Sequence, residues 1–155
     1  RIYPGRKAAP VIAARDVLVK ALPLPPEPGR DVSITFLSPT DTTGGNPLAE
    51  PHKLLTRLLR RVDGISRWNG MALTNEAGRA LAAHIRTLGF DTGGLRPGAY
   101  SSSNAHRQKR VKTTITGALV LSGNIAPIWP LLAMGERCHL GRGAVEGLGA
   151  FSLSG

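Results

Sequence analysis

GRGAVEGLG, residues 141–149, places four glycines within nine residues near the end of the 155-residue chain. An apolar segment, 128–134, precedes it and a strand-like run, 150–153, follows it. Glycine adopts positive φ without a Cβ clash, and the amide groups of such a loop can turn toward an anion. A flexible turn between two elements is the commoner role of a glycine-rich stretch. Arg142 within the loop and Arg137 just before it add positive charge and favour the anion-binding role.

A basic segment, HRQKRVK at residues 106–112, leads into the strongest strand pattern of the chain, residues 113–122. Side chains along a strand alternate between its two faces. If the strand extends back into the basic segment, one face packs on helices and the other presents cations and hydroxyls to a nucleic-acid backbone. The apolar set is Val111, Ile115, Leu119 and Leu121, and the polar set is His106, Gln108, Arg110, Lys112, Thr114 and Thr116. Between residues 106 and 145 six basic residues stand against one acid, which predicts a cationic surface around the glycine loop.

The first part of the chain predicts one strand and two helices. Residues 32–37 alternate apolar and polar side chains, as a half-buried strand does. From Pro51 to Gly64 an apolar helical stripe recurs, formed by Leu54, Leu55, Leu58, Leu59 and Val62. The basic residues on the opposite side of this helix are read as a solvated face. Thr74 is predicted to cap a second helix that ends at Gly89 and turns four apolar residues inward: Ala77, Leu81, Ile85 and Leu88.

The order of the predicted elements decides the fold class. Residues 90–97 read as turn-rich, and a short helix is predicted over 128–134 behind Pro127. The order strand, helices, strand, strand, short helix, glycine-rich loop, strand is the βαββαβ order of ferredoxin-like folds. We therefore predict an α+β domain over residues 31–155, with an antiparallel sheet covered by helices on one face. The proline-containing residues 1–30 are predicted to be a lead-in or linker.

The composition limits the class of protein. A net charge of +10 favours a polyanionic partner, and nucleic acid is the commonest one, although ribosomal and membrane-surface proteins share this property. The single cysteine excludes an intramolecular disulfide and a CxxC zinc site, in agreement with a reducing cytoplasm. We expect a cytoplasmic protein without metal, cofactor or membrane span. The chain begins at Arg1 rather than methionine, so we expect it to be a processed piece or part of a longer protein.

Three motifs in order resemble a known family. They are ITFLSPT at 34–40, the basic run 106–112 that leads to 116–118 and Gly123, and HLGRGAVEGLG at 139–149. In this combination the chain resembles the RAMP superfamily, and within it the C-terminal half of CRISPR precursor-RNA processing endoribonucleases. The resemblance covers roughly residues 32–153.

The resemblance implies a protein that binds CRISPR repeat RNA and cuts it once per repeat without a metal ion. In that family the 2′-hydroxyl attacks the adjacent phosphate and leaves a 2′,3′-cyclic phosphate and a 5′-hydroxyl. Family members usually have two ferredoxin-like halves, and the general acid/base histidine commonly lies in the N-terminal half. This chain has no complete first half, and residues 1–30 could hold only its last strand and the linker.

The predicted site combines one candidate base with a set of RNA-binding residues. His106 is the candidate catalytic residue, because its cationic neighbours favour the neutral imidazole that can act as a base; the alternative is a histidine that only contacts RNA or solvent. The residues predicted to bind RNA are Arg107, Lys109, Arg110, Lys112, Arg137, Gly141, Arg142, Gly143, Gly147 and Gly149. CRISPR repeat RNA is the expected partner, with other CRISPR effector subunits as further candidates.

Two alternative functions stay open. One is a non-catalytic RAMP subunit that holds guide RNA inside an interference complex. The other is a ribosomal or generic RNA-binding protein, which would show no preference for a repeat hairpin over unrelated RNA.

Overall fold

The computed structural model describes residues 29, 31–68, 70–103 and 109–155. Its elements follow in the order β1 (Asp31–Asp41), α1 (His52–Trp68), α2 (Asn75–Ile85), β2 (Gly89–Asp91), β3 (Leu95–Ser103), β4 (Lys109–Ser122), η2 (Ala126–Ile128), α3 (Trp129–Cys138), η3 (Ala144–Glu146) and β5 (Phe151–Ser154). The predicted lead-in, residues 1–28 and 30, lies outside the described residues.

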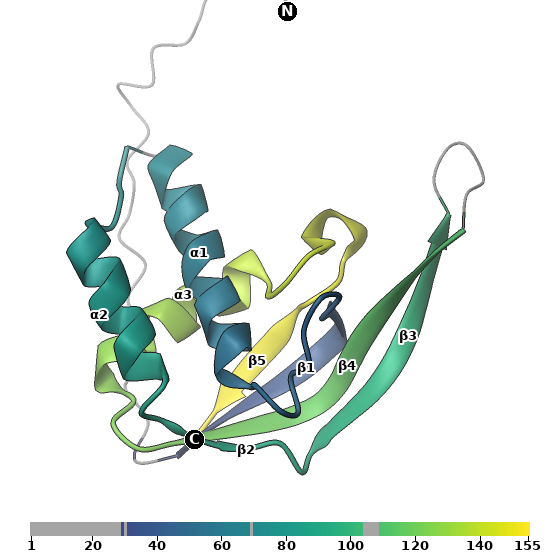
Figure 1. The fold of residues 1–155 in the computed structure, drawn as a ribbon, viewed down its shortest axis with the longest axis horizontal. Coiled ribbons are helices and arrows are strands. Elements are labelled where there is room, and N and C mark those ends of the chain that lie inside the picture. Colours follow the sequence, from purple (N-terminus) through teal and green to yellow (C-terminus); the bar gives the residue numbers. More distant parts are fainter. Residues whose placement is uncertain (1–28, 30, 69, 104–108) are drawn as a thin grey trace, which may run out of the picture.

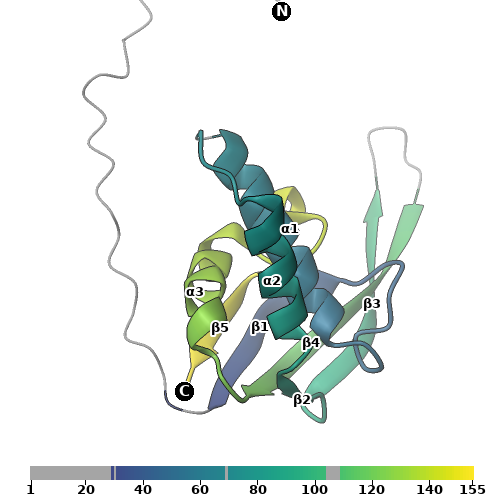
Figure 2. The ribbon, with the colours of Figure 1, turned by 60° about the vertical axis from the view of Figure 1, so that its left-hand side comes forward.

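All pairings in the five-stranded sheet are antiparallel, and the strand order is β2-β4-β1-β5, with β3 also paired to β4. Because β2 and β3 both lie along β4, they act as one strand that is interrupted at residues 92–94. The first strand of the chain, β1, therefore lies between β4 and the last strand, β5, which forms an edge of the sheet, as in ferredoxin-like folds. Figures 1 and 2 show the three α-helices on one side of the sheet. The predicted fold class is confirmed.

The core lies between the sheet and these helices. Ile34 of β1 stands opposite Leu119 of β4, and both side chains are fully buried. The predicted stripe of α1 is buried as a whole. In α2, Thr74 accepts a hydrogen bond from the Ala77 N–H, as an N-cap residue does. The helical and strand periodicities of the sequence thus predicted which faces are buried in the middle of the domain.

A glycine explains why β2 and β3 are separate. Gly117 has φ +93°, and a Cβ there would lie 2.1 Å from the carbonyl oxygen of Gly94. The Ala118 N–H donates to that same oxygen at 3.2 Å. The chain at residues 92–94 therefore folds against β4 at the only kind of residue that permits such a close approach.

The bounds of helix α1 and of the stretch after α2 differ from the prediction. Helix α1 runs through Gly64 to Trp68, because Gly64 stands in open space and a helix tolerates one glycine at a modest cost. The stretch 90–97, read as turn-rich, contains β2 and the start of β3. The prolines and glycines there weaken the pattern of a strand, whereas the edge position beside β4 tolerates them.

The alternation of β4 fails near its N-terminal end. Val111, predicted to be buried, is 67% exposed, whereas Thr114 is 2% exposed. The pairing of β1 with β4 ends at Asp41 opposite Thr114, so β1 does not accompany Val111. The Thr42 N–H still donates to the Thr113 carbonyl at 2.9 Å, and a turn follows at residues 43–44. In Figure 1 the β3–β4 hairpin extends beyond the helices. This explains why the alternation of apolar and polar residues no longer predicts which side chains are buried there.

Candidate functional site

The glycine-rich loop is a closely packed structure. Its four glycines, Gly141, Gly143, Gly147 and Gly149, all have φ between +78° and +85°. A Cβ at Gly149 would lie 1.8 Å from the Leu140 carbonyl oxygen. The Leu140 N–H donates to the Gly149 carbonyl at 2.7 Å, and the Gly149 N–H donates to Pro39 at the β1 bulge at 3.0 Å. The glycines therefore allow the loop to close on itself and on β1.

Most amides in the second half of this loop already have partners. The N–H groups of Glu146 and Leu148 both donate to the Gly143 carbonyl, at 2.8 and 3.1 Å, and the Gly147 N–H donates to Ala144 at 3.0 Å. These amides are therefore not turned toward an external anion. A ligand would meet exposed side chains instead, those of Arg142 and the fully exposed Val145.

The loop and β4 share a cavity of about 400 Å³, lined by Asp41, Thr43, Val111, Lys112 and Arg142. Arg142 forms an isolated antiparallel bridge with Asp41 at the end of β1. Lys112 also approaches the loop, since its Nζ atom lies 3.3 Å from the place that a Cβ on Gly143 would take. The structure thus brings together two predicted RNA-binding residues that are 30 positions apart in the sequence.

Acidic residues balance the charge of this cavity. Lys112 Nζ lies 2.5 Å from Glu146 Oε1, and the Lys112 side chain is only 17% exposed. Asp41 is buried and accepts a hydrogen bond from the Thr43 N–H at 2.9 Å. Both acids lie outside the window of residues 106–145 in which six basic residues face one acid.

The other predicted site residues are placed as follows. Arg137 is exposed in the last turn of α3 and does not line the cavity. Lys109 and Arg110 pair through their backbones with Ser103 and Ser102 of β3, and their side chains lie outside the described part of the structure. His106 and Arg107 lie outside the described residues altogether.

The turn from α3 into the glycine loop is strained. His139 has φ 59° and ψ 159°, a backbone conformation that is found almost only for glycine. Its Nδ1 atom is buried and has no hydrogen-bond partner among the described residues. Arg61, one of the basic residues read as solvated, donates its Nε to the Cys138 carbonyl at 2.5 Å and so ties α1 to this turn. No residue pattern signalled this strain, because histidine has no preference for such a conformation.

Asp41 and Glu146 are the site residues that the sequence analysis missed. Glu146 lies inside the quoted loop, and the four-residue spacing from Arg142 could have drawn attention to it. Asp41 is the last residue of β1, a strand whose end was predicted four residues too early. Within the described ranges, no three side chains of His, Cys, Asp or Glu are grouped so that they could hold a metal ion. None of the helices described here is long and apolar enough to span a membrane.

Comparisons with known proteins agree with this geometry. The model of the CRISPR-associated endoribonuclease Cas6 family matches residues 34–151. Thermus thermophilus Cas6 (TTHB231) is 18% identical with a TM-score of 0.58, over 81% of this chain and 53% of that one. The same protein in a product complex is 19% identical with a TM-score of 0.60, over 81% and 51% of the two chains. Cas6 (TTHA0078) in a substrate mimic complex is 20% identical with a TM-score of 0.50, over 82% and 54%.

The chain therefore spans about half the length of these solved proteins. A search of curated proteins found no match. The family match covers all three motifs that carried the resemblance to CRISPR precursor-RNA processing endoribonucleases, and it confirms that resemblance. The protein belongs to the CRISPR-associated endoribonuclease Cas6 family.

Proposed function

We propose that this chain is the RNA-binding half of an endoribonuclease that cuts CRISPR repeat RNA. The observation that carries the proposal is the meeting of Lys112 and Arg142 at one cavity between β4 and the glycine loop. A net charge of +10 supports a polyanionic ligand for this surface. Membership of the Cas6 family supports CRISPR RNA as that polyanion.

The proposed reaction requires three functions from the protein. A base removes the proton of the ribose 2′-hydroxyl, whose oxygen attacks the neighbouring phosphorus, and an acid protonates the 5′-oxygen that leaves. The products are a 2′,3′-cyclic phosphate and a 5′-hydroxyl, and no metal ion is needed. Lys112 and Arg142 would stabilise the negative charge that develops on the phosphorane oxygens. His106 is the proposed base if this half of the protein carries one.

Glu146 gives the proposed site a competing partner for Lys112. In the free protein the Glu146 carboxylate neutralises the Lys112 ammonium group. A phosphate that enters the cavity would replace this carboxylate, because the loop position of Glu146, 36% exposed, lets its side chain turn into solvent. RNA binding then exchanges one ion pair for another, which lowers affinity but disfavours non-specific anions.

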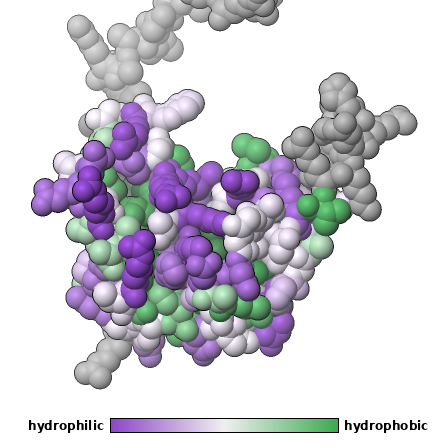
Figure 3. Space-filling view, in the orientation of Figure 1, coloured by the Kyte–Doolittle hydropathy of each residue, from purple (hydrophilic) through white to green (hydrophobic). Residues whose placement is uncertain are grey.

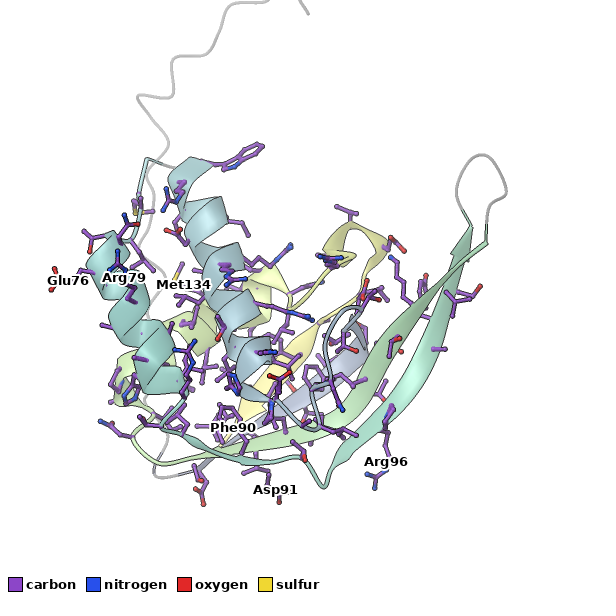
Figure 4. All side chains as sticks on the ribbon, viewed as in Figure 1. Glu76, Arg79, Phe90, Asp91, Arg96 and Met134 are labelled. Atoms are coloured by element: carbon purple, nitrogen blue, oxygen red, sulfur yellow. The ribbon has the colours of Figure 1, made fainter. Side chains whose placement is uncertain are left out.

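The test uses the purified chain and CRISPR repeat RNA in EDTA. We expect the Lys112→Gln/Arg142→Gln variant to bind the repeat hairpin more weakly than the wild type. The matched control is Lys53→Gln/Arg96→Gln, which also removes two positive charges: Lys53 pairs with Glu50 at the start of α1, and Arg96 on β3 points away from the helices (Figure 4). Equal losses in both variants, or equal affinity for unrelated RNA, would contradict the proposal.

Cleavage is measured in the same samples. Products with cyclic phosphate ends that form in EDTA and disappear in His106→Ala, while binding is retained, would support a catalytic role for His106. Binding without any cleavage would show that this half holds the RNA and that the catalytic base lies elsewhere.

A further inference from the structure

A second basic surface lies on the helix layer. Helices α1 and α2 border a groove of about 470 Å³. Four arginines line it: Arg60 and Arg67 from α1, Arg79 from α2, and Arg86, the residue that caps the C-terminus of α2. Asp63 is the single carboxylate among the lining residues. In Figure 3 strongly hydrophilic residues gather over the part of the surface where Figure 1 places these two helices.

Only one of these arginines has an acidic partner. Asp63 accepts hydrogen bonds from the Arg67 Nε at 2.9 Å and from the Leu73 N–H at 3.0 Å, and these two donors lower its pKa. The described residues offer no ion pair to Arg60, Arg79 or Arg86. Glu76, the acid of α2, points away from α1 (Figure 4). An ordinary solvated helix pair intersperses acids and bases, so this unbalanced groove is better explained by a bound anion.

The spacing of the arginines suits a chain of charges. On each helix the two arginines are seven residues apart, which corresponds to about two turns or roughly 10.5 Å along the axis. The helices run side by side in opposite directions (Figures 1 and 2), so the groove has one such pair on each wall. Guanidinium groups bind phosphates with two parallel hydrogen bonds each. The start of α2, where Thr74 and Asn75 line the groove, adds the positive end of a helix dipole.

An exposed aromatic side chain follows one of these arginines in the sequence, although it is not itself among the residues that line the groove. Trp68, the last residue of α1 and the neighbour of Arg67, is 93% exposed. Exposed aromatic rings next to a cationic track are typical of proteins that bind single-stranded nucleic acid, because bases stack on the ring while the phosphates meet the cations. An acidic peptide would use the arginines but would give this exposed indole no partner.

We propose that the groove between α1 and α2 binds the phosphates of a single-stranded RNA segment, with Trp68 as a platform for one base. This site lies on the helix layer and is separate from the cavity of Lys112 and Arg142. The inference rests on the proposed function only in naming RNA as the polyanion. It assigns to the helix layer a flanking segment of the RNA that the hairpin and glycine loop hold.

The two tryptophans of the chain provide a local probe. Trp129 is buried in the core, whereas Trp68 is exposed, so a change in fluorescence and a loss of quenching by acrylamide report on Trp68. We expect unstructured oligouridylate to protect Trp68. In Arg79→Gln/Arg86→Gln the affinity should fall, and the slope of log K against log salt should decrease by about 1.4, at roughly 0.7 per single-strand phosphate. Both side chains are exposed and unpaired within the described part, so the variant is expected to fold.

Three further variants separate the possible results. Lys53→Gln/Arg96→Gln should keep the wild-type affinity and slope. Lys112→Gln/Arg142→Gln should keep the Trp68 signal with oligouridylate but bind the repeat hairpin weakly; wild-type hairpin binding in this variant would sink the proposed function and leave the groove in place. Asp63→Asn should strengthen oligouridylate binding, because it removes the only carboxylate that lines the groove.

Three results would overturn the inference. The first is the absence of any Trp68 signal at saturating oligouridylate. The second is an unchanged affinity and slope in Arg79→Gln/Arg86→Gln. The third is poly-glutamate binding in the groove as tightly as oligouridylate, which would assign the site to an acidic protein partner.

Discussion

Replacing Glu146 by glutamine should increase the affinity of the protein for repeat RNA. In the free protein the Glu146 carboxylate holds Lys112 Nζ at 2.5 Å beside the cavity that Arg142 also lines. If a phosphate takes the place of this carboxylate, the wild type must break an ion pair before Lys112 can bind RNA. Glutamine keeps the size and polarity of the side chain and removes its charge.

The expected size of the effect follows from the exposure of the pair. The side chains of Lys112 and Glu146 are 17% and 36% exposed, so the pair is partly screened by solvent. Pairs of this kind contribute about 0.2–1 kcal/mol, and 1 kcal/mol corresponds to roughly a fivefold change in affinity. We therefore expect Glu146→Gln to lower the Kd for repeat RNA by up to about fivefold and to steepen the salt slope by about 0.7 to 0.9, the contribution of one neutralised phosphate.

Fluorescence anisotropy with a labelled repeat hairpin, repeated over a series of salt concentrations, measures both quantities. The decisive comparison is a double-mutant cycle with Lys112→Ala. In the Lys112→Ala background Glu146→Gln should change the Kd much less, because the lysine that the glutamate restrains is gone. An equal gain in both backgrounds would mean that Glu146 acts only through the general field of the protein. No gain in either background would refute the idea that RNA reaches Lys112.

Three predictions concern stability. Gly149→Ala should lower the free energy of unfolding by more than about 3 kcal/mol, because it combines positive-φ strain with a backbone clash. Gly147→Ala should lower it by only about 1–2 kcal/mol, because a Cβ there would meet nothing within 4 Å. Urea denaturation measures both values. His139→Gly should raise the free energy of unfolding by about 1 kcal/mol, because it relieves the strained backbone by more than it adds to the flexibility of the unfolded chain. Hydrogen bonds lower the pKa of Asp63 in the folded protein, and the bond from the Leu73 N–H contributes most. Asp63 therefore adds stability above its unfolded pKa of about 3.9, and this stability is lost as the pH falls through the lower folded pKa. The destabilisation by Asp63→Asn should shrink in acid, which a series of melting temperatures against pH measures.

Each of these has a clear contrary outcome. Equal costs for the two glycine variants would mean that the close contact of Gly149 with Leu140 relaxes without strain. A less stable His139→Gly protein would show that the imidazole makes a contact worth more than the strain. A melting-temperature difference for Asp63→Asn that stays constant across the acid range would separate the role of this residue from its charge.

The central elements of the domain could be predicted from local patterns. These elements are the apolar stripe of α1, the Thr74 cap and the shared buried face of Leu119 and Leu121. Each depends on residues that lie close together in the sequence, so the periodicity of the chain is sufficient to predict it. The glycine spacing of residues 141–149 also identified the loop, since four positive-φ positions require a residue without a Cβ. The three motifs in order were sufficient to indicate the family.

The tertiary structure decided what surrounds those elements. Strands β2 and β3 exist because β4 offers them hydrogen bonds, and Val111 is exposed because β1 ends before reaching it; neither fact is local to the residues concerned. The same holds for charge: Glu146 and Asp41 come to the cavity from two different segments and balance its two cations, whereas the arginines of α1 and α2 meet with one acid between them. A sequence records how many charges a chain carries, but electrostatic energy depends on the distances between them, and only the folded chain sets those distances.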